Sequence, residues 1–177
     1  MGKKKISFAL SSTDIDRAIK ELANYKQEIQ RKTDLLRERI AERLAEEAKQ
    51  GFAGAVVDDV ILKGGVHAPK YAQVDVSVDN RGSVTVVVAS GEDAIWVEFG
   101  AGVYHNGSAG SSPHPHGAEL GFTIGSFGKG NGKRQTWGFY EDGELKLTHG
   151  TPANMPMTRA VTTVCNEIVS IAKEVFG

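Results

Sequence analysis

The sequence predicts a single α+β domain in which two helices accompany a mainly antiparallel sheet. Residues 13–50 and 157–176 carry apolar side chains at helical spacing. Residues 55–150 between them contain alternating β runs that meet at turns with glycine. This order predicts helix, strands, a long loop, a hairpin and a C-terminal helix packed on the sheet.

The N-terminal helix is unusually long. Ser11-Ser12-Thr13-Asp14 offers N-cap candidates, and the first glycine after them, Gly51, is the expected stop. About 37 helical residues would form a rod of roughly 55 Å. Residues 30–34 are polar on every face, so the rod either continues or breaks there. The helix either lies across its own sheet or forms an arm, residues 13–50, whose apolar stripe packs on a neighbouring subunit.

The central region predicts strands at residues 55–62, 71–78 and 84–89. Asp79-Asn80-Arg81-Gly82 joins the last two and is typical of a hairpin turn. A second hairpin is expected from residues 136–140 and 144–148 around Asp142-Gly143. Residues 94–99 fit either a strand or a short helix, because six residues do not reveal a period.

A glycine-rich segment separates the two hairpins. Nearly half of the 21 glycines fall between Gly100 and Gly132, which predicts a flexible loop over residues 103–133. Trp96 and Trp137 border it, and such aromatic residues either close a core or anchor a protein interface. Lys129, Lys133 and Arg134 are candidates for contacts to DNA phosphates, although the segment lacks the spacing of a phosphate-binding P-loop.

The overall charge gives no sign of a nucleic-acid-binding surface. The formal net charge is −1 and the sequence pI is near 6.5. A lone cysteine, Cys165, excludes an intrachain disulfide framework and suits a reducing compartment. The sequence contains no apolar run of about 20 residues, so we expect no membrane partner and synthesis in the cytoplasm.

Few residues suggest chemistry. His114 and His116 flank a proline and form the best metal candidate, with Glu98 as a conceivable third ligand. A small metal-dependent hydrolase built on these three residues is therefore one alternative. The pattern favours a solvated loop instead, because glycine and serine around the histidines supply no rigid scaffold. Glu98 itself is either a buried general base or, as is commoner, an acid on a solvated face.

Two short motifs become distinctive when they are taken in order. The first is Trp96-Val97-Glu98-Phe99-Gly100-Ala101-Gly102, followed by a variable loop. The second is Pro152-Ala153, then Pro156-Met157 and the helical Ala160. Together they resemble the neck, head–tail joining and tail-completion (minor structural) proteins of tailed bacteriophages. Ala101 and Met157 depart mildly from the threonine and phenylalanine commoner there.

This resemblance implies a structural protein of a phage or prophage particle without enzyme activity or cofactor. It implies a homo-oligomeric ring at the head–tail junction or the upper end of the tail, with DNA passing through without sequence-specific binding. Partners would be further copies and neighbouring neck and tail proteins. The candidates for subunit contacts are Trp96, Glu98, Phe99, Gly100, Gly102 and Trp137. A free-standing coiled-coil dimeric adaptor that uses the N-terminal arm is a further alternative.

Overall fold

The structure is a computed structural model that describes residues 9, 11–61, 65–100, 114–117, 119–120, 136–148 and 150–177. The elements follow the order α1, β1–β4, α2, β5, β6 and α3. The predicted α+β class is confirmed. Most of the loop predicted at residues 103–133 lies outside the described residues.

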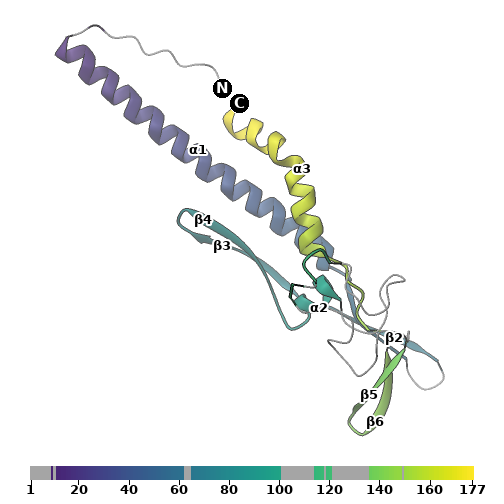
Figure 1. Ribbon diagram of the computed structural model, residues 1–177. Helices are drawn as coiled ribbons and strands as arrows, with labels where there is room; N and C mark the ends of the chain where they lie inside the picture. The colour runs from purple at the N-terminus through teal and green to yellow at the C-terminus, as the bar shows by residue number, and fades with distance from the viewer. Residues whose placement is uncertain are drawn as a thin grey trace.

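Helix α1 (Ser12–Phe52) is the longest element of the structure, and β5 and β6 lie beyond its C-terminal end (Figure 1). Ser11 is its N-cap, and the Ser11 hydroxyl oxygen accepts a hydrogen bond from the Asp14 N–H at 3.2 Å. The break considered at residues 30–34 does not occur. Local bonds sustain the helix there, because Gln30 Nε2 donates to Asp34 Oδ1 at 3.2 Å and Thr33 Oγ1 donates to the Ile29 carbonyl at 2.9 Å.

Gly51 does not end α1, which continues to Phe52. Gly51 lies where the start of α3 crosses the helix. A Cβ atom on Gly51 would lie 2.8 Å from Pro156 Cβ. The glycine therefore permits a close approach between the two helices, and its role is packing rather than termination.

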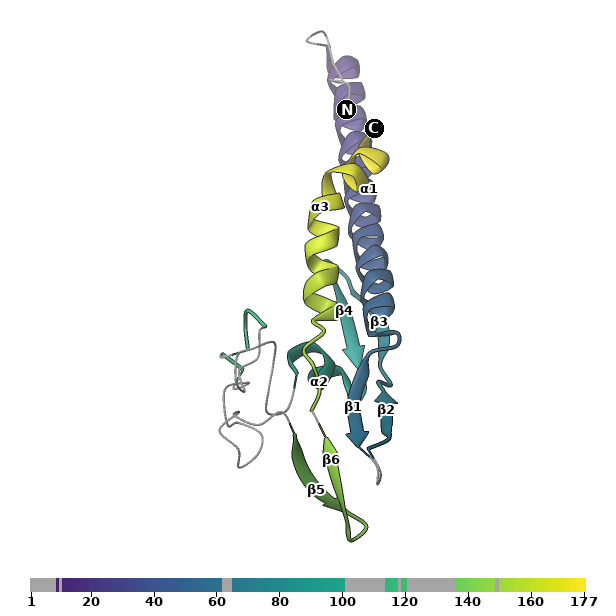
Figure 2. The same cartoon turned by 90° about the vertical axis from the view of Figure 1, so that its right-hand side faces the viewer.

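Helix α3 (Pro156–Phe176) packs along α1, not on the sheet as the sequence predicted. Both views show α3 beside the C-terminal half of α1, while the N-terminal part of α1 projects past it (Figure 2). At the end of α3, Lys32 Nζ lies 5.9 Å from the centroid of the Phe176 ring. The residues of α1 before Lys32 therefore form an arm of about 30 Å that α3 does not cover.

The strands in the described ranges form two antiparallel sheets. β3 (Asp75–Arg81) and β4 (Val84–Ser90) make a hairpin that packs against α1. β1 (Val56–Ile61), β2 (His67–Tyr71), β5 (Trp137–Glu141) and β6 (Glu144–Thr148) make a four-stranded sheet in the order β2-β1-β6-β5. Both predicted hairpins are confirmed. The strand predicted over residues 71–78 is correct only from Asp75, because Tyr71 ends β2 and residues 72–74 separate it from β3. The turn predicted at residues 79–82 is displaced, because β3 continues to Arg81 and only Gly82 and Ser83 separate it from β4.

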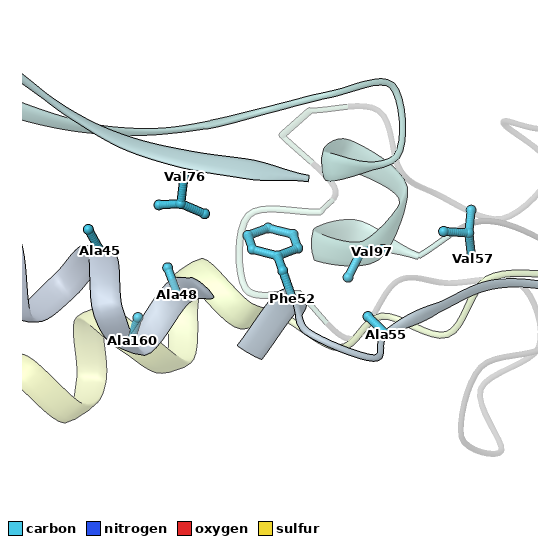
Figure 3. Packing of buried hydrophobic residues seen from close by; sticks show 8 residues of the cluster. All are labelled: Ala45, Ala48, Phe52, Ala55, Val57, Val76, Val97 and Ala160. Carbon is cyan, nitrogen blue, oxygen red and sulfur yellow. The ribbon is translucent and has the colours of Figure 1, made fainter. Parts of the chain in front are cut away.

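The core lies where α1, α3, α2 (Ala94–Phe99) and the β3–β4 hairpin converge (Figure 3). Alanines on α1 face this contact and permit the helices to approach closely. The cluster contains Ala45, Ala48, Phe52, Ala55, Val57, Val76, Val97 and Ala160. Within the described ranges, no helix combines the length and apolar character needed to cross a lipid bilayer.

Candidate functional site

The two sequence motifs meet at the start of α3. Residues 94–99 form the short helix α2, which resolves the choice between strand and helix. The Val97 carbonyl accepts a hydrogen bond from the Asn154 N–H at 2.9 Å. The next residue, Glu98, is buried at 7% exposure and points toward the first turn of α3. The prediction that Glu98 lies on a solvated face is therefore wrong.

The Glu98 carboxylate caps α3 from outside the helix. Its Oε2 accepts a hydrogen bond from the Met157 N–H at 2.8 Å, and its Oε1 accepts one from the Thr158 N–H at 3.0 Å. Helix α3 needs this acceptor because its N-cap, Met155, supplies no side-chain hydrogen bond. A negative carboxylate is also favoured at the positive end of the helix dipole.

Met155 adopts a left-handed conformation with φ of 51°. This conformation is uncommon for a residue other than glycine and is held in place by the contacts around it. Pro156 follows at the first helical position, where its missing N–H is not needed. The turn into α3 is thus set by Met155 and Pro156 and stabilised by Glu98.

His114 completes this cluster from the glycine-rich segment. It is buried, with Nε2 at 2.8 Å from Thr158 Oγ1 and at 3.2 Å from Glu98 Oε1. Its Nδ1 accepts a hydrogen bond from the His116 N–H at 3.0 Å. Because Nδ1 is an acceptor, the neutral ring carries its proton on Nε2 and donates it toward Thr158 and Glu98.

The geometry of the cluster suits a structural joint. A histidine that activates a hydroxyl needs an unprotonated Nε2 facing it, whereas Nε2 of His114 carries the proton. The Thr158 hydroxyl donates its own proton to Glu98 Oε1 at 2.7 Å. The hydrogen bonds therefore run from the histidine through the threonine to the carboxylate. They tie the loop, α2 and α3 together.

The ring of Phe99 packs on His114, with centroids 4.1 Å apart and planes tilted by 48°. His116 lies 5.9 Å from His114 between ring centroids, and its side chain is exposed and contacts Glu119 Oε2 at 3.0 Å. The expectation of a solvated loop fits His116 and is wrong for His114. No group of three or more metal-ligating side chains occurs in the part of the chain that the structure describes.

The remaining candidates are dispersed. Trp96 is half-buried on α2 and Gly100 is buried directly after it, with φ of 77°. Trp137 begins β5 in the four-stranded sheet, an element separate from α2. Gly102, Lys129, Lys133 and Arg134 lie outside the described residues.

Thr158 and Gly51 belong to the site but were not predicted from the sequence. The signal for an external cap was present, because Met155 precedes α3 where Ser, Thr, Asp or Asn usually stands. Nothing in the sequence indicated which carboxylate would supply the cap.

A second polar contact joins α1 to α3. Arg43 donates to Glu167 through Nε at 2.8 Å and Nη2 at 3.1 Å, and Arg43 Nη1 lies 2.6 Å from Glu47 Oε1. The hydrogen bond with Arg43 is the main cause that lowers the pKa of the Glu167 carboxyl. The same bond raises the pKa of the Arg43 guanidinium. This two-pronged pair fixes the register of the two helices.

Comparison of the chain with protein-family models, with curated proteins and with solved structures returned no match.

Proposed function

We propose that the chain is a structural assembly protein of a tailed phage or prophage. It would form or complete a ring at the head–tail junction or at the upper end of the tail. The observation that carries this proposal is a set of hydrogen bonds that join the two sequence motifs on which the resemblance to phage proteins is based. Glu98 of the first motif caps the helix that begins within the second. Both motifs therefore serve one joint that holds α2, α3 and His114 together.

The surface supports an assembly role. A soluble monomer seldom exposes rows of large apolar side chains, and such rows commonly mark protein interfaces. Two helices of this chain carry such rows. On α1 they are Ile15, Ile19, Leu22 and Tyr25, and on α3 they are Val161, Ile168 and Val169.

The charge supports passage of DNA rather than its retention. A protein that binds duplex DNA tightly neutralises phosphates with many lysines and arginines. The 21 basic residues of this chain are balanced by 22 acidic residues. A ring of such subunits would let DNA pass without holding it.

The test is deletion of the gene from the phage or prophage that carries it. We expect DNA-filled heads and separate tails in electron micrographs, and recovery of joined particles when the gene is supplied in trans. We also expect peptides of the chain in purified particles, at several copies per particle. Normal particle yield after deletion, or absence of the chain from particles, would overturn the proposal.

A dimeric coiled-coil adaptor remains the second candidate, because the apolar row of the α1 arm recurs at spacings of three and four residues. Such an adaptor would pair arm with arm in a two-fold dimer and would be absent from phage particles. Light scattering on purified protein, together with the particle analysis, separates the two functions.

A further inference from the structure

Helix α3 is apolar over a wider arc than α1 covers. At 3.6 residues per turn, one side of α3 carries Ala160, Val164 and Val175 and packs on α1. The exposed fractions of these three residues are 2%, 4% and 7%. The adjoining side carries a second apolar row that we call the α3 stripe: Val161, Ile168, Val169, Ala172 and Phe176. The exposed fractions of Val161, Ile168 and Val169 are 47%, 41% and 61%. All stripe residues except Val161 line a shallow apolar groove.

The arm of α1 carries the matching feature. Ile15, Ile19, Leu22 and Tyr25, which we call the arm stripe, are 39%, 58%, 55% and 36% exposed. The arm stripe and the α3 stripe cannot meet within one chain. Arg43 is bound to Glu167, and Leu22 lies 21 residues before Arg43, or about 30 Å along a straight helix.

The areas indicate that both stripes are needed. A half-exposed aliphatic side chain offers on the order of 100 Å² of apolar surface. Either stripe alone therefore supplies about half of the roughly 800 Å² that each partner covers in a stable interface. One contact between an arm stripe and an α3 stripe is therefore about half the standard size. A copy in a closed ring makes two such contacts, one through each stripe, so ring closure brings the buried surface of each copy to about that of a stable interface.

The charges along the two stripes are complementary. Asp14, Glu21 and Glu28 recur every seven residues along one border of the arm stripe. Arg159 and Lys173 lie fourteen residues apart along the outer border of the α3 stripe, and both are exposed. Asp14 and Glu28 are fourteen residues apart, the same separation as Arg159 and Lys173. The acidic border of the arm therefore favours pairing with α3 over pairing of arm with arm.

We propose that the arm of one copy docks on the α3 stripe of the next copy, in a head-to-tail contact between identical chains. The contact deepens the proposed ring function and rests on it. A head-to-tail contact joins different surfaces of the two copies, so it propagates until a ring closes. The middle of the arm stripe, at Leu22, then lies near the middle of the α3 stripe, at Cys165 and Ile168.

The first experiment combines two full-length variants, Ile19→Asp in the arm stripe and Val169→Asp in the α3 stripe. Each buries a charge in one half of every contact, so each alone is expected to stay monomeric in light scattering. Their mixture retains one intact pair of surfaces. At high protein concentration, which a single contact of this size needs, we expect a 1:1 dimer of about twice 19.0 kDa that grows no further. Matched controls are Asn24→Asp and Ser170→Asp on exposed sides of the same helices that face away from the two stripes, and both should assemble as wild type does.

The second experiment uses Cys165, which is exposed and is the only cysteine of the chain. Leu22→Cys should give a ladder of oxidised oligomers beyond the dimer, because each copy then holds one thiol on each docking surface. Asn24→Cys, on the opposite side of the arm, should not. A mixture of the two aspartate variants that stays monomeric would overturn the proposal. So would a wild-type chain that stays monomeric at high concentration, or one linked only through Cys165 of both copies.

Failure of this contact is distinguishable from failure of the proposed function. If deletion of the gene uncouples heads from tails and each aspartate variant alone still restores joined particles, the docking contact alone is wrong. If the purified variants behave in light scattering as expected but the chain is absent from particles, the phage role alone is wrong.

Discussion

The Thr158 N–H and hydroxyl both donate to one oxygen of Glu98, at 3.0 and 2.7 Å, so a residue of α2 caps a helix through a residue 60 positions later in the chain. This cap joins the two sequence motifs, because Glu98 belongs to the first motif and Met157, which it also binds, belongs to the second. It explains why an acid stands within the otherwise apolar run of α2. Four predictions follow from this joint and from the contacts near it.

Replacement of Glu98 should destabilise the protein strongly. Glu98→Ala removes a buried acceptor from two backbone N–H groups and the Thr158 hydroxyl, so we expect a loss of about 3 kcal/mol in the free energy of unfolding. Glu98→Gln keeps one oxygen and should lose roughly half as much. Urea unfolding measures both, with the exposed Glu92→Gln as a control that should stay within about 0.5 kcal/mol of wild type. Equal stability of Glu98→Ala and wild type would contradict the cap.

Gly51→Ala should destabilise the protein although alanine is the better helix former by about 1 kcal/mol. The added Cβ would lie 2.8 Å from Pro156 Cβ, and the resulting shift should cost about 2–3 kcal/mol before the propensity gain. Thermal unfolding should therefore show a lower midpoint. Gln50→Ala, at the exposed preceding residue, should be neutral. A higher midpoint for Gly51→Ala would show that α3 does not approach so closely.

The Arg43–Glu167 pair should make stability depend on pH. Arg43 lowers the pKa of Glu167, so the pair stabilises the fold fully above the ordinary value of 4.5 and this contribution is lost as the pH falls through the folded value. Wild type and Glu167→Gln should therefore differ at neutral pH and converge in acid. Urea unfolding across pH tests this, with the exposed Glu42→Gln as the matched control. A constant difference at all pH values would exclude the pair as its cause.

His114→Ala should loosen the attachment of the glycine-rich segment while leaving α3 capped. Glu98 retains both backbone donors, so we expect a loss of only about 1–2 kcal/mol. Cleavage by trypsin after Lys129, Lys133 or Arg134 should become faster, as measured by mass spectrometry. His116→Ala is the control, because that side chain is exposed. Identical cleavage rates for the two variants would mean that His114 does not anchor the segment.

The sequence predicted the elements well where local chemistry decides them. Asp142 and Gly143 both adopt positive φ, at 53° and 80°, as a tight hairpin turn requires. Ser11 caps α1 through its own hydroxyl, and this too is a contact between near neighbours. The split between β2 and β3 was not predictable, because Ala72 bonds back to Ala55 and leaves the run of alternating residues.

The site was only partly predictable. Glu98 stood out because it is an acid in an apolar run, but its partners Thr158 and His114 come from other parts of the chain. Residue type misled twice, both times in the same direction. It favoured solvent for Glu98 and for His114, and both are buried. Burial depends on what packs above a side chain, which spacing along one element does not reveal.

The sequence by itself determined which stretches are helices and hairpins, because caps, turns and periodicity act over a few residues. Only the tertiary structure decided what each face of those elements meets. The large apolar side chains at the start of α1 lie exposed, while its alanines, such as Ala45 and Ala48, form the core. The physical reason is the close crossing of α1 and α3 at Gly51 and Pro156, which has room only for small side chains.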